Sequence, residues 1–256
     1  MFPMGLILKR ALPRPALEDF QRFLFIGPHP DDIEIGAGAA AAKLAAAGKK
    51  ICFLICTDGR YGTENLKEDP GPDLLARRRR KEALKGAAVL GVRDVRFLNL
   101  SDAGFYTEEA LLRGIASVTG DFKPDLILAP DPAPSNETHP DHLRAGRAAG
   151  QIACFASQPH IMERYGGGAA PVKGIAYYMT AHPDVFINTY GYTTLQRKAI
   201  ACHSSQFPAD SDAWRDLVLY LKLRAGFSGL RSLSRRAEGF RMLGHSQLHV
   251  LSEFGG

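Results

Sequence analysis

The sequence lacks the features that mark secreted and membrane proteins. Its four cysteines, in 256 residues, form no C-x-x-C pair and no disulfide framework. No stretch approaches the roughly 18 apolar residues that a membrane span requires, and the first ten residues lack the apolar length of a signal peptide. We therefore expect a soluble protein of the cytoplasm, with reduced thiols and no membrane span.

The chain also lacks positive charge in excess outside one segment. It has 32 basic and 27 acidic residues, a net charge of +5, and the run Arg77-Arg78-Arg79-Arg80-Lys81 alone supplies five positive charges. The remainder of the chain is therefore neutral. A nucleic-acid site would need aromatic or further basic residues near this run, so we expect no nucleic-acid partner.

What is present is the composition of a globular protein, 45% hydrophobic and 23% charged. Short apolar runs alternate with helical stretches, which is the pattern of βαβ units. We predict a Rossmann-like α/β fold in a single domain over residues 1–256. It has a mainly parallel sheet with helices on both faces and a C-terminal α+β extension. The predicted strands are 23–27, 50–57, 95–100, 125–129, 174–179 and 185–188, and the predicted helices are 36–48, 73–90, 107–120, 193–203 and 211–223.

Two clusters of metal-ligand residues follow predicted strands. Pro28-His29-Pro30-Asp31-Asp32 follows the first strand, and Glu137-Thr138-His139-Pro140-Asp141-His142 follows the fourth. Because ligands of open α/β sheets bind beyond the carboxyl ends of the strands, the two clusters should meet. Two imidazoles and one carboxylate leave coordination positions open on Zn²⁺ or Fe²⁺. Asp31 and Asp32 are adjacent and cannot easily point the same way, so one can bind the metal while the other acts as general base.

The second cluster also predicts the start of a helix. Pro140 suits the first helical position, so Asp141 lies at the positive helix end. His139 and His142, three residues apart, lie on neighbouring sides of the first turn, so one can ligate while the other contacts substrate. His182-Pro183-Asp184 repeats the tripeptide without a second aspartate, and we interpret it as a turn.

A dinucleotide-binding motif competes with the metal site. Gly36-Ala37-Gly38-Ala39-Ala40-Ala41 matches G-x-G-x-x-A, and Asp58 lies near the end of the second strand, where a ribose-binding acid would stand. The alternative function is therefore a dinucleotide-dependent oxidoreductase that uses the Gly36/Gly38 turn. Against it, eight residues separate the motif from the strand, and the glycines then serve close packing of the first helix.

The chain resembles the LmbE-like (PIG-L) family of zinc-dependent N-deacetylases, and is most similar to its diacetylchitobiose deacetylase branch. The resemblance extends from Phe25 to about His249. It rests, besides the two clusters, on Thr57-Asp58-Gly59, the Arg79–Glu82 spacing, Leu90-Gly91-Val92, Ala129-Pro130-Asp131-Pro132, His203-x-Ser205-Gln206-Phe207-Pro208 and Glu238-Gly239-Phe240-Arg241-Met242.

This resemblance implies a hydrolase that removes the N-acetyl group from a GlcNAc-containing sugar and releases acetate and a free amine. The roles it implies are Zn²⁺ ligation by His29, Asp32 and His142, deprotonation of zinc-bound water by Asp31, oxyanion stabilisation by His139, orientation of a neighbouring histidine by Asp141 and contact with sugar hydroxyls by Arg79 and Asp102. It further implies a homo-oligomer in which a C-terminal histidine, His249 or else His245, reaches the neighbouring subunit's site. Ile33 stands where the family usually has an acidic residue, so the identity of the sugar stays open.

Overall fold

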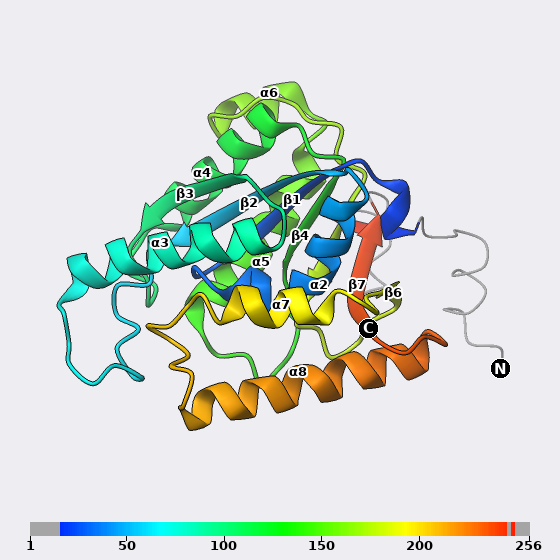
Figure 1. The fold of residues 1–256 in the computed structure, drawn as a ribbon. Helices are drawn as coiled ribbons and strands as arrows, with labels where there is room; N and C mark the ends of the chain where they lie inside the picture. The colour runs from blue at the N-terminus through cyan, green and yellow to red at the C-terminus, as the bar shows by residue number, and fades with distance from the viewer. Residues whose placement is uncertain (1–15, 245–246, 249–256) are drawn as a thin grey trace.

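A single mixed sheet forms the centre of the fold. The computed structural model describes residues 16–244 and 247–248, and within them seven strands are ordered β3-β2-β1-β4-β5-β7-β6 (Figure 1). The strands β3, β2, β1, β4 and β5 are parallel to one another, whereas β7 is antiparallel to both β5 and β6. The strands are β1 Arg22–Gly27, β2 Lys50–Thr57, β3 Asp94–Leu100, β4 Leu126–Pro130, β5 Gly174–Tyr178, β6 Val185–Asn188 and β7 Ala237–Gly244.

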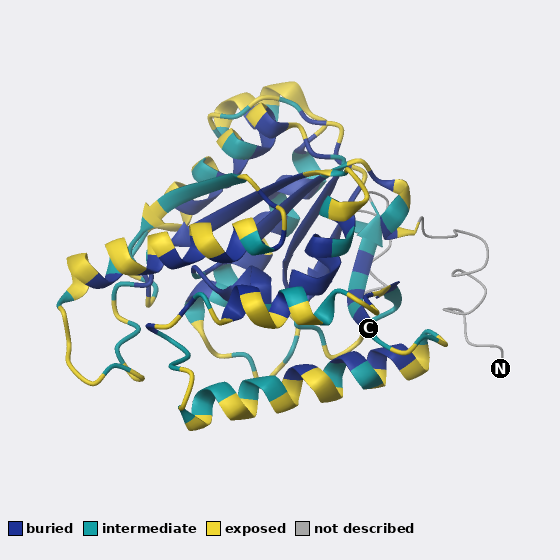
Figure 2. Cartoon of the chain, in the orientation of Figure 1, coloured by how far each residue is buried: buried dark blue, intermediate teal, exposed yellow. Residues whose placement is uncertain are grey.

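Helices cover both faces of this sheet, as the sequence predicted. Successive residues of a strand point to opposite faces, so Phe23 and Phe25 of β1 pack in one apolar layer while Leu24 and Ile26 pack in the other. Side chains of α2, α3 and α7 complete the first layer, and those of α4, α5 and α6 the second. Figure 2 shows the central strands β1, β2, β4 and β5 as buried, whereas β3 at the edge of the sheet is of intermediate burial. The helices are η1 Leu17–Asp19 (3₁₀), α2 Asp32–Ala46, α3 Pro72–Val89, α4 Glu108–Phe122, α5 Pro140–Phe155, α6 Pro159–Arg164, α7 Thr193–Ile200 and α8 Asp212–Arg231.

The predicted elements are present, with differences in bounds and in number. The helix α2 begins at Asp32 instead of residue 36, so the aspartate pair stands at its N-terminus, and the helix α8 continues to Arg231. The 3₁₀ helix η1, the helix α6 and the strand β7 were not predicted. Among the described residues, no helix is long and apolar enough to cross a membrane.

Candidate metal centre

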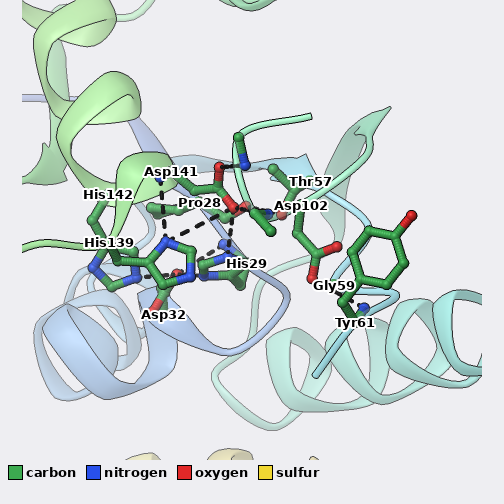
Figure 3. Close-up of polar contacts among 12 residues, drawn as sticks. Pro28, His29, Asp32, Thr57, Gly59, Tyr61, Asp102, His139, Asp141 and His142 are labelled. Carbon is green, nitrogen blue, oxygen red and sulfur yellow. Dashed lines mark hydrogen bonds and ion pairs between the residues drawn. The ribbon is translucent and has the colours of Figure 1, made fainter. Parts of the chain in front are cut away.

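The two predicted clusters meet at the carboxyl edge of the sheet. The strand β1 pairs in parallel with β4, so the loops that follow them lie side by side. His29 lies in the turn after β1, Asp32 is the first residue of α2, and His142 lies in the first turn of α5. The residues therefore come from three elements that the sheet brings together (Figure 3).

Three of these side chains point their ligand atoms at one place. The Nδ1 of His29 lies 3.0 Å from the Oδ2 of Asp32, and the Nε2 of His142 lies 3.4 Å from the same oxygen. All three ligand atoms lie within 4.8 Å of one another. Two imidazole nitrogens and a carboxylate oxygen are donors that suit Zn²⁺ or Fe²⁺ and leave further coordination positions open, so the donor set fits a catalytic metal.

The charges around Asp32 agree with a cation site. Burial alone would raise the pKa of Asp32, but His142 and His29 hold it well below its ordinary value. Burial alone would lower the pKa of both histidines, yet hydrogen bonds to Asp141 and Asp32 raise that of His29 to about 10, and Asp32 raises that of His142 to about 9. Asp32 thus attracts positive charge, and metal ligation, which needs neutral imidazoles, would displace the protons.

A second group, His29 with His139 and Asp141, also brings ligand atoms within 4.8 Å. Asp141 is fully buried there, and its oxygens already accept hydrogen bonds from the backbone N–H groups of Ala103 and Gly104, each at 2.8 Å. Its Oδ2 also lies 3.0 Å from the Nε2 of His29. A carboxylate on one ring nitrogen leaves the other free for a metal, so Asp141 orients His29 instead of ligating, and the first group is the better metal site.

No role was predicted from the sequence for Glu137, although its carboxylate contacts His142, the third candidate metal ligand. Its Oε2 lies 3.0 Å from the Nδ1 of His142, and its Oε1 accepts a hydrogen bond from the backbone N–H of His139. The side chain of His139 is 44% exposed and caps α5, its Nδ1 accepting from the backbone N–H of Asp141. The position of Glu137, five residues before a predicted ligand in the same loop, was the available signal.

The two aspartates point in different directions, as their adjacency required. Asp32 faces the imidazoles, whereas the Oδ1 of Asp31 accepts a hydrogen bond from the Nη2 of Arg79 at 3.2 Å. Arg79 also donates through Nη1 to the carbonyl of Gly59. It is the buried member of the basic run on α3, whereas Arg77, Arg78, Arg80 and Lys81 are exposed. One cation of the run therefore belongs to the site.

Asp102 adds a carboxylate beside the centre. Its Oδ2 accepts a hydrogen bond from the backbone N–H of Tyr61 at 3.2 Å, and its Oδ1 is buried without a partner among the described residues. Burial raises the pKa of this carboxyl group. A buried polar atom without a partner is a natural contact for a polar ligand.

The glycines of the competing motif do not form a phosphate-binding turn. Gly36 and Gly38 lie inside α2, where a Cβ at Gly36 would stand 2.2 Å from the ring of Tyr178 and one at Gly38 would stand 3.1 Å from Gln196. They allow close packing of α2, as the sequence had suggested, and the dinucleotide interpretation loses its turn. His249 and His245 lie outside the described residues.

Comparison with known proteins identifies relatives of this site. The family model described as PIG-L, GlcNAc-PI de-N-acetylase, matches residues 24–153. The chain is 33% identical over 236 residues to diacetylchitobiose deacetylase of Thermococcus kodakarensis, which covers 91% of this chain and 86% of the relative. It is 28% identical to a 1D-myo-inositol 2-acetamido-2-deoxy-alpha-D-glucopyranoside deacetylase of Kineococcus radiotolerans. This match covers 66% of the present chain and 54% of the relative. The structure of N,N′-diacetylchitobiose deacetylase from Pyrococcus horikoshii matches with a TM-score of 0.86 and 30% identity, over 98% of this chain and 96% of the other.

Proposed function

Because this chain belongs to the PIG-L family, we propose that it hydrolyses the N-acetyl group of a GlcNAc-containing sugar and releases acetate and a free amine. The named relatives are deacetylases of diacetylchitobiose and of a GlcNAc–inositol compound. The observation that carries the proposal is the convergence of His29, Asp32 and His142, with Asp31 next to Asp32 in the chain. We assign this activity to one domain over residues 1–256.

The metal that we propose is Zn²⁺, which when bound lowers the pKa of a coordinated water and polarises the acetyl carbonyl. Asp31 is the general base in this proposal, since it adjoins Asp32 in the chain and has Arg79, not an imidazole, as its hydrogen-bond partner. It accepts the proton of the attacking water and returns it to the leaving amine. Arg79 fixes the direction of Asp31 through the 3.2 Å hydrogen bond.

His139 is the proposed donor to the oxyanion. Burial and the neighbouring His29 lower its pKa, so its imidazole is neutral at pH 7. Because its Nδ1 accepts from the backbone N–H of Asp141, the proton of the neutral ring lies on Nε2. This N–H can stabilise the negative charge that develops on the acetyl oxygen.

The sugar itself is held, in this proposal, by Asp102 and Arg79. The Oδ1 of Asp102 and the Nε of Arg79 are both buried polar atoms without a partner in the described part of the chain. An acceptor and a donor at the edge of the metal centre are suited to the hydroxyl groups of a pyranose.

We also propose that the chain forms a homo-oligomer in the cytoplasm. Leu219, Leu223, Phe227 and Leu230 of α8 expose more than half of their surface, which favours contact with a second copy. The four free cysteines fit a reducing compartment. In this assembly His249, or else His245, would reach the neighbouring site.

Metal analysis combined with acetate release tests the proposal. We expect the purified protein to contain about one Zn²⁺ and to release acetate from N,N′-diacetylchitobiose. Asp31→Asn should keep the metal and lower kcat by about 10² to 10⁴, whereas His142→Ala should lose the metal as well. Undiminished activity in Asp31→Asn would contradict the mechanism. Iron found in place of zinc would change the assigned metal. Bound metal without acetate release would indicate a binding protein instead of an enzyme.

A further inference from the structure

Two exposed aromatic rings stand beside the metal centre and have no role in the chemistry described above. Tyr61, in the loop after β2, is 47% exposed, and Phe105, in the loop after β3, is 71% exposed. Their ring centroids lie 5.9 Å apart with an interplanar angle of 86°. An edge-to-face pair covers at most one of the four ring faces, so open aromatic surface faces solvent here.

The loop that carries Phe105 is held rigidly. The backbone N–H groups of Ala103 and Gly104 donate to Asp141, and Arg144 donates to the carbonyl of Gly104 at 2.9 Å. Ala103 has a φ of +57°, a left-handed conformation that alanine rarely adopts, and Gly104 follows at +78°. Backbone strain that the surroundings enforce is concentrated at functional sites. The exposure of Phe105 is therefore fixed by the same carboxylate that orients the metal ligand His29.

Tyr61 is fixed to the site from the other side. Its backbone N–H donates to the Oδ2 of Asp102, whose Oδ1 has no partner within residues 16–244 and 247–248. Figure 3 shows the carboxylate of Asp102 between His29 and the ring of Tyr61. A ligand that extends from the metal centre past Asp102 therefore meets the aromatic pair next.

We propose that Tyr61 and Phe105 form a stacking platform for a second sugar ring bonded to the acetamido sugar at the metal centre. The inference rests on the proposed function and names its substrate class as disaccharides and longer oligosaccharides. A pyranose presents C–H groups on its faces, and an aromatic ring presents a negative, weakly hydrated face that attracts them. Neither the metal centre nor Asp102 explains why two apolar rings should be held in water at this point.

Binding measured without turnover tests the platform. In an Asp31→Asn background, we would measure by calorimetry the Kd of the metal-loaded protein for N,N′-diacetylchitobiose and for GlcNAc. Phe105→Ala should weaken disaccharide binding about tenfold and leave GlcNAc binding within about twofold. Phe105→Trp should retain the preference for the disaccharide, and Tyr61→Phe should do the same because the ring, and not the hydroxyl, is used.

Tyr190→Ala is the matched control. Tyr190 is also an exposed aromatic residue, at 57%, but it follows β6 at the far end of the sheet from β1. It should leave both Kd values unchanged. The platform would be overturned if Phe105→Ala weakened the binding of both sugars equally, or if it weakened the binding of neither. It would also be overturned if Phe105→Ala sedimented as a smaller assembly, because Phe105 would then be a subunit contact.

The proposed function fails by a different result. Suppose that the protein binds the disaccharide more tightly than GlcNAc, that Phe105→Ala removes this preference, and that no acetate is released. The platform then stands and the deacetylase proposal does not. If acetate is released and Phe105→Ala leaves the preference intact, the deacetylase proposal stands and the platform does not.

Discussion

Asp141 is the residue on which the geometry of the centre depends most. Its two oxygens join two backbone N–H groups of the loop after β3 to the imidazole of His29. Burial alone would raise its pKa, but the hydrogen bond to His29 lowers it, so the carboxylate is charged at neutral pH. One buried side chain therefore sets both the tautomer of a ligand and the position of a loop.

Replacing this carboxylate should weaken metal binding more than it disturbs the fold. Asp141→Asn keeps the size of the side chain but removes the charge and one acceptor oxygen, so we expect metal affinity to fall by about 10- to 100-fold. Competition with a chelator measures this. Asp131→Asn is the matched control, because Asp131 is also buried and pairs with Arg241 outside the centre. Unchanged affinity in Asp141→Asn, or an equal loss in Asp131→Asn, would contradict the role.

The buried pair of His203 and Glu34 should make stability depend on pH. Their Nε2 and Oε1 atoms lie 3.3 Å apart. Burial alone would lower the pKa of His203, but Glu34 raises it, and burial raises the pKa of Glu34. Both folded values lie above the unfolded ones, so the stabilisation is complete below about pH 6.5 for the histidine and is lost as pH rises through the folded pKa.

We therefore expect the free energy of unfolding to fall as pH increases above about 6.5, as measured by urea denaturation. His203→Gln should remove part of this slope. His182→Gln, at an exposed histidine, serves as control and should keep it. An identical slope in His203→Gln and the unsubstituted protein would show that the pair does not take up the proton.

At the scale of elements, α2 connects the centre to the core. Its N-terminus carries the aspartate pair, and its glycines bring it against β5, where the hydroxyl of Tyr178 donates to the carbonyl of Ile26. The backbone of α2 is irregular at Ala37, with a φ of −146°. The helix is thus shaped to approach Tyr178 closely, and the position of Asp32 depends on that approach.

Gly36→Ala should destabilise the protein by about 1–3 kcal/mol, because the added methyl group would stand 2.2 Å from the ring of Tyr178. The midpoint of urea unfolding measures this change. Gly168→Ala is the matched control, since a Cβ there meets nothing closer than 3.9 Å. Equal midpoints for the two variants would refute the close-packing argument.

The central elements could be predicted because their sequences are unambiguous. The strand β2 is buried at every position after the first and reads as one apolar run. The strand β7 could not be recognised, because Glu238 and Arg241 interrupt its pattern. Glu238 is buried and accepts from the backbone of Ala40, while Arg241 pairs with Asp131. Their partners lie far away in sequence, and no local pattern reveals them.

In the metal centre too, some features could be predicted from the sequence and others could not. That His29, Asp32 and His142 converge follows from strand order and residue type. The ion pair between Arg79 and Asp31 does not, because the spacing of α3 from the first loop is a tertiary property. The charge of the five cations is uniform in sequence; the family resemblance named Arg79 as a sugar contact, but its burial and its pairing with Asp31 are properties of the packing.

At the scale of the molecule, the outer side of α8 is an exposed apolar surface in the part of the chain that the structure describes. Leu219, Leu223, Phe227 and Leu230 recur every three or four residues, so they form one stripe along the helix. Figure 2 shows α8 along one side of the molecule with much of its outer surface exposed. A stripe of apolar side chains exposed to water is unusual for a monomer and supports the proposed homo-oligomer.

Introducing charge into the stripe should break the assembly. We expect sedimentation of the unsubstituted protein at a multiple of 27.9 kDa and of Leu223→Glu or Phe227→Glu at a lower multiple, because a buried carboxylate would lack a partner. Leu84→Glu is the control, since Leu84 is 44% exposed on α3. Sedimentation of the unsubstituted protein as a monomer would exclude the assembly.

The place of β7 also has a consequence for synthesis on the ribosome. The strand β7 is the last of the seven strands in the sequence, but it lies between β5 and β6 in the sheet. In the described structure β6 pairs only with β7. Until residues 237–244 emerge, the nascent chain has an open edge at β5, where strands of other chains can pair. The proposed metal ligands, of which His142 is the last in sequence, are synthesised long before. The nascent protein would therefore carry all three proposed ligands while its sheet is still open to aggregation.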